Sequence, residues 1–133
     1  MLFQTPLLFP HLNIADNISF GLSREHRGAS RRTMIEEALK AAGLAGFGPR
    51  DPATLSGGQQ SRVALLRTLL AAPEALLLDE PFASLDDNAR AKNIALLRAE
   101  TKTRGVPVLL VSHDPRDAAL ADMPVISLSQ KQS

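Results

Sequence analysis

The sequence predicts an α/β fold in which helices alternate with the strands of a parallel sheet. Two short runs, residues 75–78 and Val108–Val111, contain apolar residues only. Such runs, without polar alternation, are typical of parallel strands that are buried on both faces. Helix start and stop signals precede each run, and residues 125–128 form a further candidate strand. This alternation of helices and strands predicts a parallel α/β sheet.

Composition narrows the classes of function. The chain has 133 residues, of which 44% are hydrophobic, so a packed core is possible. Its formal net charge of +1 gives no electrostatic reason to bind nucleic acid or an anionic membrane. The sequence has no cysteine, which excludes disulfides and thiolate metal sites. No apolar run approaches the roughly 20 residues that span a bilayer, so we expect contact with a membrane only through a partner.

Two helices are expected in the first third of the chain. Asn13 is a suitable N-cap for a helix over residues 14–22, and Ser30 is one for a helix over residues 31–42. The apolar residues of the second helix follow the 3.6-residue period, and Gly43 follows it where a helix often ends. Together with the loop that follows, which is rich in glycine and proline, they predict a small helical unit.

Three further helices are expected in the rest of the chain. Their starts are marked by Ser56 with Gln59 as a capping box, by Asp86 or Asp87, and by Asp114 followed by Pro115. Their ends are expected at about residue 72 before Pro73, at Gly105 and near Asp122. These helices would flank the apolar runs and complete the α/β pattern.

The first candidate site is the helix start at Ser56, Gly57, Gly58 and Gln59. Two glycines at a helix start let the backbone approach a ligand closely, and the N–H groups and dipole of the helix favour an anion. The four residues alone are equally compatible with a well-capped helix whose glycines serve only a turn.

The second candidate site lies where the expected strands end. Asp79 and Glu80 directly follow the run 75–78, and His113 follows the run Val108–Val111. Ligands of parallel sheets bind at the carboxyl ends of the strands, where carboxylates can act in acid–base or metal chemistry. An acidic pair in this place could also cap a loop, and a lone histidine after a strand is usually structural or simply exposed.

Together these segments resemble ABC (ATP-binding cassette) ATPases, and most closely the importer branch. Residues 52–67, with the sequence PATLSGGQQSRVALLR, are similar to the signature segment of the family almost residue for residue. Asp79 and Glu80 resemble the Walker B acids, and residues 81–86 resemble the approach to the D-loop. Residues 111–114 resemble the switch-histidine segment, and residues 2–12 resemble the Q-loop.

The resemblance implies a role for each motif residue. Asp79 would hold Mg²⁺ through water, Glu80 would polarise the attacking water, and His113 would meet the γ-phosphate of ATP. Gln4 would sense both Mg²⁺ and the γ-phosphate. The residues implied to contact a nucleotide bound on a second subunit are Ser56, Gly57, Gly58, Gln59 and, from the D-loop, Asp86.

The sequence also departs from the family. It contains no G-x-x-x-x-G-K-[ST] phosphate loop (Walker A), since the comparable spacing from Gly43 to Gly48 is followed by proline and arginine. It has no Tyr or Trp to stack on adenine. The resemblance therefore implies the C-terminal part of a P-loop NTPase-type α/β core, here incomplete, with an inserted helical subdomain. The expected divisions are residues 1–12, 13–54 and 55–133.

Two functions are compatible with these residues. The first is part of an ATP-hydrolysing subunit that energises import on the cytoplasmic face of the bacterial inner membrane. Its implied partners are a second ATP-binding subunit and a permease, which the Q-loop and helical region would contact. The second is a truncated, non-catalytic module that binds a permease or a full-length subunit. A reading frame with a Lys-bearing phosphate loop upstream of Met1 would favour the first function.

Overall fold

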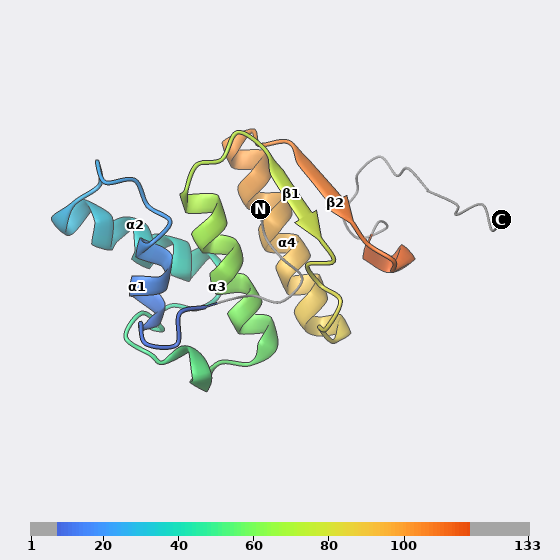
Figure 1. Cartoon of the computed structure of the whole chain (residues 1–133), viewed down its shortest axis with the longest axis horizontal. Coiled ribbons are helices and arrows are strands. Elements are labelled where there is room, and N and C mark those ends of the chain that lie inside the picture. Colours follow the sequence, from blue (N-terminus) through green and yellow to red (C-terminus); the bar gives the residue numbers. More distant parts are fainter. Residues whose placement is uncertain (1–7, 118–133) are drawn as a thin grey trace.

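The computed structural model describes residues 8–117 of the chain, which form helices packed beside a small sheet (Figure 1). In chain order its elements are α1 (Ile14–Ser19), α2 (Gly28–Ala41), the 3₁₀ turn η1 (Pro52–Thr54), α3 (Gly57–Leu70), β1 (Leu76–Asp79), α4 (Asp87–Arg104) and β2 (Val108–Val111). A further helix begins after Asp114. Within the described residues no helix is both long and apolar enough to cross a bilayer. Gln4 and residues 118–133, for which the sequence makes predictions, lie outside the described part.

The two strands pair in parallel, which confirms the predicted α/β class. Leu76 lies opposite Val108, and Asp79 lies opposite Val111. β1 therefore begins and ends one residue later than the predicted run 75–78. Because α4 connects two parallel strands, the chain forms a β–α–β unit. Both strands then end at the same edge of the sheet.

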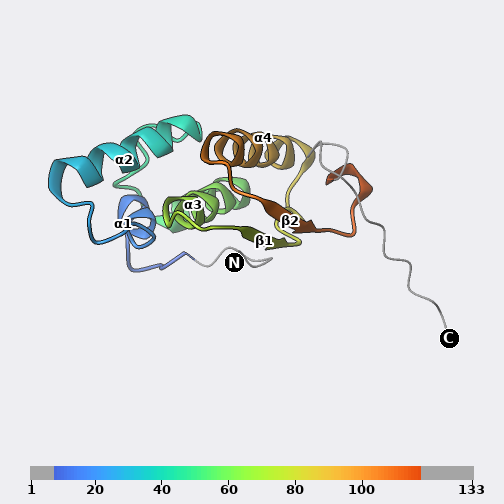
Figure 2. The ribbon, with the colours of Figure 1, turned by 90° about the horizontal axis from the view of Figure 1, so that it is seen from above.

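The sheet is covered on one face only, so the prediction of strands buried on both faces is wrong for this part of the chain. α3 and α4 lie on the same side of the two strands (Figure 2). On that side, Leu76 and Leu78 are buried. On the opposite face, Leu77, Leu109 and Val111 keep 41%, 62% and 45% of their surface exposed. The physical reason is that none of the described elements packs against this second face.

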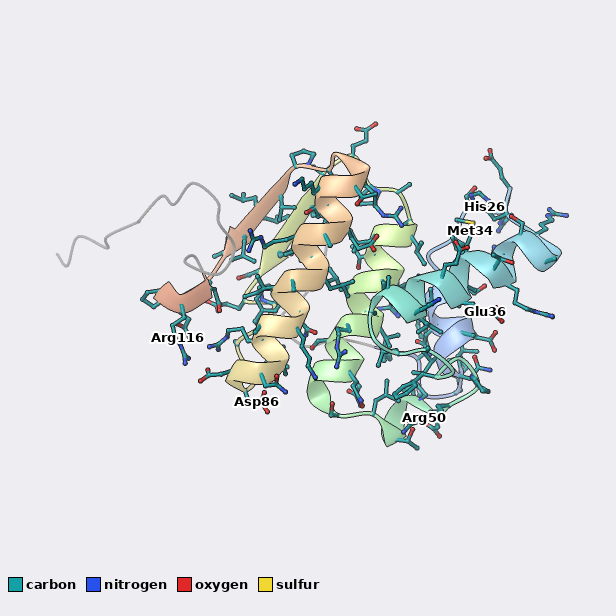
Figure 3. The ribbon with its side chains drawn as sticks, turned by 180° about the vertical axis from the view of Figure 1, so that it is seen from behind. His26, Met34, Glu36, Arg50, Asp86 and Arg116 are labelled. Carbon is teal, nitrogen blue, oxygen red and sulfur yellow. The ribbon has the colours of Figure 1, made fainter. Side chains whose placement is uncertain are left out.

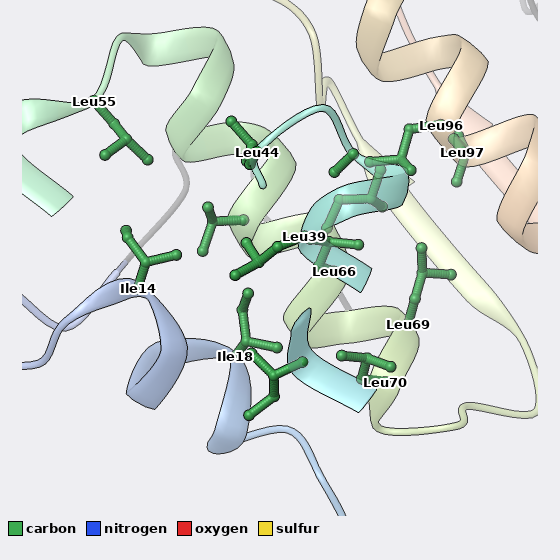
Figure 4. Close-up of a cluster of buried hydrophobic side chains, with 14 of the residues drawn as sticks. Ile14, Ile18, Leu39, Leu44, Leu55, Leu66, Leu69, Leu70, Leu96 and Leu97 are labelled. Atoms are coloured by element: carbon green, nitrogen blue, oxygen red, sulfur yellow. The ribbon is translucent and has the colours of Figure 1, made fainter. Parts of the chain in front are cut away.

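One hydrophobic core joins the helical region to the sheet. α3 lies at its centre, with Leu66 and Leu69 fully or almost fully buried. Ile14 and Ile18 of α1 reach the same cluster, as do Leu39, Leu44, Leu96 and Leu97 from other parts of the chain (Figure 4). A buried side chain of this size stabilises the fold by about 1.5–3 kcal/mol. α3 therefore serves both regions, and the division of the chain at residues 13–54 and 55–133 stays a prediction.

α1 begins as predicted and ends early. The Asn13 side chain accepts a hydrogen bond from the Asp16 N–H at 2.8 Å, which confirms the predicted N-cap. The helix ends at Ser19 rather than at residue 22. Gly21 follows this end, and a Cβ there would lie 2.2 Å from the carbonyl oxygen of Arg67 on α3. Only glycine therefore fits at this close approach of the two segments.

α2 begins earlier than predicted, and Ser30 is not its N-cap. The helix starts at Gly28, whose φ of +60° is a left-handed conformation that glycine adopts freely. No side chain caps this start. Instead, the Arg31 guanidinium donates to the His26 carbonyl at 3.0 Å and to other groups of the preceding loop. The Arg31 contact attaches the helix start to the preceding loop but is not a cap, because a guanidinium has no acceptor for the N–H groups of the helix start.

The other helix boundaries agree closely with the sequence. Gly43 follows α2 with φ +73° and donates to the Lys40 carbonyl, as in a Schellman motif. Asp86, rather than Asp87, is the N-cap of α4, and Gly105 ends that helix with φ +65°. α3 has the predicted capping box but ends at Leu70, two residues early.

We predict that Leu109→Thr reduces self-association of this chain. Leu109 is the most exposed apolar residue on the uncovered face of the sheet, and large exposed apolar patches promote association. Threonine keeps the preference for strand structure, so we expect an unchanged fold. The measurement is light scattering together with binding of an apolar dye.

The control for this prediction is Leu110→Thr. Leu110 packs against the core on the covered face, so its replacement should lower the free energy of unfolding without reducing self-association. If Leu109→Thr leaves both scattering and dye binding unchanged, the uncovered face is not the cause of association.

Candidate functional site

The two acidic residues at the end of β1 have different surroundings. Asp79 is the last residue of the strand, and its side chain is exposed. Glu80 follows with φ 47°, a left-handed conformation that non-glycine residues rarely adopt. Its N–H donates to the Val111 carbonyl at 2.8 Å and so continues the pairing with β2 beyond the strand. Only 11% of the Glu80 side chain is exposed. The turn therefore separates an exposed carboxylate from a buried one.

The structure brings Glu80 and His113 together. The His113 N–H donates to Glu80 Oε1 at 2.6 Å, and the ring Nδ1 contacts the same oxygen. The His113 side chain is 95% exposed, whereas that of Glu80 is not. One carboxylate oxygen thus holds the histidine, whose ring faces solvent at the carboxyl end of the sheet. The ring is therefore open to a ligand at this edge of the sheet.

Asp114 is the N-cap of the helix that follows His113. Its carboxylate accepts from the N–H and from the guanidinium of Arg116. These hydrogen bonds, helped by the charge of the arginine, lower the pKa of Asp114 to about 2. The carboxylate therefore stays charged at neutral pH and keeps the helix start next to His113 in place.

Asp79 is suited to Mg²⁺ as a single ligand. Mg²⁺ prefers oxygen ligands and is often held by one or two carboxylates, water and the phosphates of a substrate. Among the described residues there is no cluster of three or more His, Cys, Asp or Glu that could enclose a metal by itself. The exposed carboxylate of Asp79 at a strand end fits a site in which one carboxylate, water and the phosphates of a substrate hold Mg²⁺. Gln4, the other residue implied to sense the metal, lies outside the described residues.

The helix start at 56–59 forms a complete capping box. Ser56 Oγ accepts from the Gln59 N–H at 3.3 Å, and Gln59 Oε1 accepts from the Ser56 N–H at 3.0 Å. Both polar side chains are thus used within the helix start. The feature that remains for a ligand is the exposed Gly57 at the positive end of α3.

The two glycines of this segment have different roles in the structure. A Cβ on Gly57 would meet nothing within 4 Å, so this position is open. A Cβ on Gly58 would lie 2.7 Å from the Cβ of Ala89 on α4. The Asn93 amide also donates to the Gly58 carbonyl at 3.3 Å. Gly58 therefore lets two helices approach each other, and only Gly57 keeps space that a ligand could use.

Asp86 lies at the start of α4, beside the start of α3. Its side chain accepts from the Ala89 N–H at 2.8 Å, so the residue predicted to contact nucleotide also caps a helix. Asp86 and Arg116 lie toward the same end of the molecule (Figure 3). The starts of α3 and α4 share that end with the carboxyl ends of β1 and β2 (Figure 1). The candidate groups are thus gathered at one end of the fold.

Two buried amides that the sequence patterns did not predict hold segments of the fold in place. Asn17 is fully buried in α1, and its amide group bonds to both the N–H and the carbonyl of Phe9. It therefore anchors the segment that follows Gln4. Asn93 is 1% exposed and connects α4 to Gly58. The available signal was an asparagine on the apolar side of each helix, where an unpaired amide would be costly.

A profile of the family described as "ABC transporter" matches residues 1–83, more than half of the chain. Two of the curated relatives extend the match over nearly the whole chain. A thiamine import ATP-binding protein, ThiQ, of Ruegeria sp. (strain TM1040) is 46% identical over 99% of the chain. An uncharacterized ABC transporter ATP-binding protein, YnjD, of Escherichia coli (strain K12) is 44% identical over 98%. The chain therefore belongs to the ABC transporter family.

The chain spans a little over half the length of these two relatives, 58% of ThiQ and 59% of YnjD. An Fe(3+) ions import ATP-binding protein, FbpC, of Agrobacterium fabrum is 46% identical over 91% of the chain, which spans 34% of that protein. The chain therefore corresponds to only a part of each of these relatives.

The fold agrees with solved structures of the same class. One is described as the dimeric structure of a post-hydrolysis state of the ATP-binding cassette MJ0796 bound to ADP and Pi. It superposes with a TM-score of 0.73 and 36% sequence identity, over 89% of this chain and 54% of that one. The described part therefore has the fold of the corresponding part of an ATP-binding cassette.

We predict opposite results for alanine at the two glycines of α3. Gly58→Ala should lower the free energy of unfolding by about 1–3 kcal/mol, because the new methyl group would collide with Ala89. Gly57→Ala should leave it unchanged or raise it by up to about 1 kcal/mol, because the site is open and alanine favours helix. Denaturant unfolding monitored by circular dichroism measures both values. Equal losses in the two variants would contradict the assignment of separate roles.

Proposed function

We propose that this chain is part of an ATP-binding and ATP-hydrolysing subunit of an import system. The observation that carries the proposal is the pair formed by Glu80 and His113 at the carboxyl end of the sheet. Membership of the ABC transporter family and the relatives named as import ATP-binding proteins support the same reading.

Each acidic residue has a distinct part in the proposed reaction. Asp79, which is exposed, would hold Mg²⁺ through water. Glu80 would accept a hydrogen bond from the attacking water and so polarise it. His113 would contact the γ-phosphate. ATP and Mg²⁺ are thus the proposed ligands. The exposure of the His113 ring and the low exposure of the Glu80 carboxylate support this division.

The site is proposed to be shared between two subunits. The printed sequence contains no Lys-bearing phosphate loop, so the cation for the β- and γ-phosphates would come from another segment. We propose that Ser56, Gly57, Gly58, Gln59 and Asp86 face a nucleotide whose phosphates are held by a second ATP-binding subunit. The open backbone at Gly57 and the positive end of α3 support this role.

The proposed location is the cytoplasmic face of the bacterial inner membrane, reached through a permease. Gln4, the segment after it and the helical region would contact the permease. Asn17 supports this role because it fixes the backbone of that segment at Phe9. The relatives are named for thiamine, Fe(3+) and sulfate/thiosulfate. Since these cargoes differ, the proposal extends to import and to no particular cargo.

We predict that Glu80→Gln, in a full-length subunit that carries this segment, preserves ATP binding and slows hydrolysis by about 10²–10⁴-fold. Glutamine keeps the size of the side chain and an acceptor for the His113 N–H, but it removes the charge that polarises water. Titration calorimetry measures binding, and phosphate release measures turnover.

The matched control is Glu74→Gln. Glu74 is an exposed acid just before β1, at the opposite end of that strand, so its replacement should leave turnover unchanged. Normal turnover in Glu80→Gln would show that Glu80 is not the base.

We also predict that this 133-residue chain alone neither binds Mg-ATP tightly nor hydrolyses it. Asp79 and Glu80 would present negative charge to a polyanion without the lysine and backbone donors of a phosphate loop. The test is calorimetric titration of the purified chain with Mg-ATP beside a phosphate-release assay. Micromolar binding, with turnover that Glu80→Gln abolishes, would reveal a phosphate site elsewhere in the chain. If this chain is a non-catalytic module, it can be mixed with a full-length subunit to test this. Glu80→Gln in this chain should then leave ATP turnover by the full-length subunit unchanged.

A further inference from the structure

A buried arginine near the start of α4 is surrounded by carboxylates. The Arg90 side chain is only 5% exposed. Its Nε lies 3.0 Å from Asp117 Oδ1, and its Nη1 lies 3.1 Å from Asp114 Oδ2 and 3.7 Å from Asp87 Oδ1. A buried charge of this kind is stable only when it is paired. Neither the capping pattern of α4 nor the roles proposed above require it.

Two of these carboxylates belong to the segment that carries His113. Asp117 has a side chain that is 1% exposed, and it accepts a hydrogen bond from Ser112 Oγ at 2.6 Å. Asp114 directly follows His113 and is 25% exposed. Arg90 therefore attracts this segment from both sides of the histidine: directly at Asp114, and through Asp117 at Ser112.

Arg90 also touches the segment that follows Glu80. Its Nη2 donates a long hydrogen bond, 3.5 Å, to the Phe82 carbonyl. The same side chain is therefore in contact with both chain segments whose ends meet in the pair of Glu80 and His113. The aspartate contacts are close enough for ion pairs, although Nε and Nη1 do not have the orientation of hydrogen bonds. The attraction consequently depends mainly on charge.

We propose that Arg90 is a positioning residue that holds His113 against Glu80. Through Asp114 and Asp117 it fixes the backbone from Ser112 onward, and this places the His113 N–H at the Glu80 carboxylate. The catalytic meaning of this arrangement rests on the proposed function. The contact itself does not, and it can be tested without ATP, so failure of this inference is distinguishable from failure of Glu80 as the base.

The test is amide hydrogen exchange followed by NMR in the 133-residue chain. The His113 N–H reports its bond to Glu80, and the Glu80 N–H reports the strand pairing with Val111. We expect Asp114→Asn to accelerate exchange at His113 by about tenfold, while exchange at Glu80 changes by less than about twofold. Asparagine caps a helix as well as aspartate does, so this variant removes the charge and keeps the cap.

Arg116→Gln is the matched control. Arg116 binds the same Asp114 carboxylate but lies at the surface, with a side chain 59% exposed, whereas the Arg90 side chain is only 5% exposed. It should leave exchange at His113 within about twofold of the parent chain. An unchanged rate at His113 in Asp114→Asn, or an equal acceleration in Arg116→Gln, would overturn the proposal.

Arg90→Lys tests the arginine itself. Lysine keeps the charge but cannot reach two carboxylates with a planar fork, so we expect faster exchange at His113 and normal exchange at Glu80. If the exchange rate rises at both amides, Arg90→Lys has loosened the strand pairing. Asp114→Asn is then the variant that tests the proposal.

A double-mutant comparison separates positioning from general loosening. In a Glu80→Ala background the acceptor of the His113 N–H is gone, so adding Asp114→Asn should change exchange at His113 by less than about twofold. A further acceleration of about tenfold in that background would mean that Asp114 acts independently of Glu80, and would contradict the proposal.

Discussion

The parallel pairing of β1 with β2 is the constraint on which the candidate site depends. It places Asp79 opposite Val111, and one further hydrogen bond, from the Glu80 N–H to the Val111 carbonyl, continues the ladder past the strand. The chain then turns through a left-handed conformation at Glu80, which costs of order 1–3 kcal/mol and persists only where neighbouring contacts enforce it. The paired strand and the His113 N–H supply those contacts. A shift of register would separate the carboxylate from the histidine.

α3 connects this site to the rest of the molecule. Its first turn lies against α4 at Gly58 and Ala89, and its middle packs against Ile14 and Ile18 of α1. α1 in turn anchors Phe9 through Asn17. The helix start proposed to face a nucleotide therefore belongs to α3, and the segment proposed to face a permease is attached to α3 through α1. Close-packed interiors transmit small displacements, so this helix is a direct physical link between the two surfaces.

Much of this arrangement could be predicted from the sequence, because local signals specify it. The Asn13 cap, the capping box at Ser56 and the glycine stop at Gly105 depend on residues only a few positions apart. Ser30 is not a cap because α2 begins earlier, at Gly28, whose left-handed φ lets the chain turn into the helix there. The Arg90 cluster was invisible because it joins residues 27 positions apart, 90 and 117, that meet only after α4 and β2 have packed. Burial on one face of the sheet, too, depends on which elements surround it and not on the composition of the strands.

The most direct test of this account is an NMR measurement of scalar coupling across the hydrogen bond between the Glu80 amide and the Val111 carbonyl. The account predicts a resolved coupling between these two groups, together with slow exchange of the Glu80 N–H, because the site is built on that pairing. A Glu80 amide that exchanges as fast as in an unstructured peptide, or that couples to a different carbonyl, would show that the strands do not pair in this register. The assembly of Glu80 with His113 would then need another explanation.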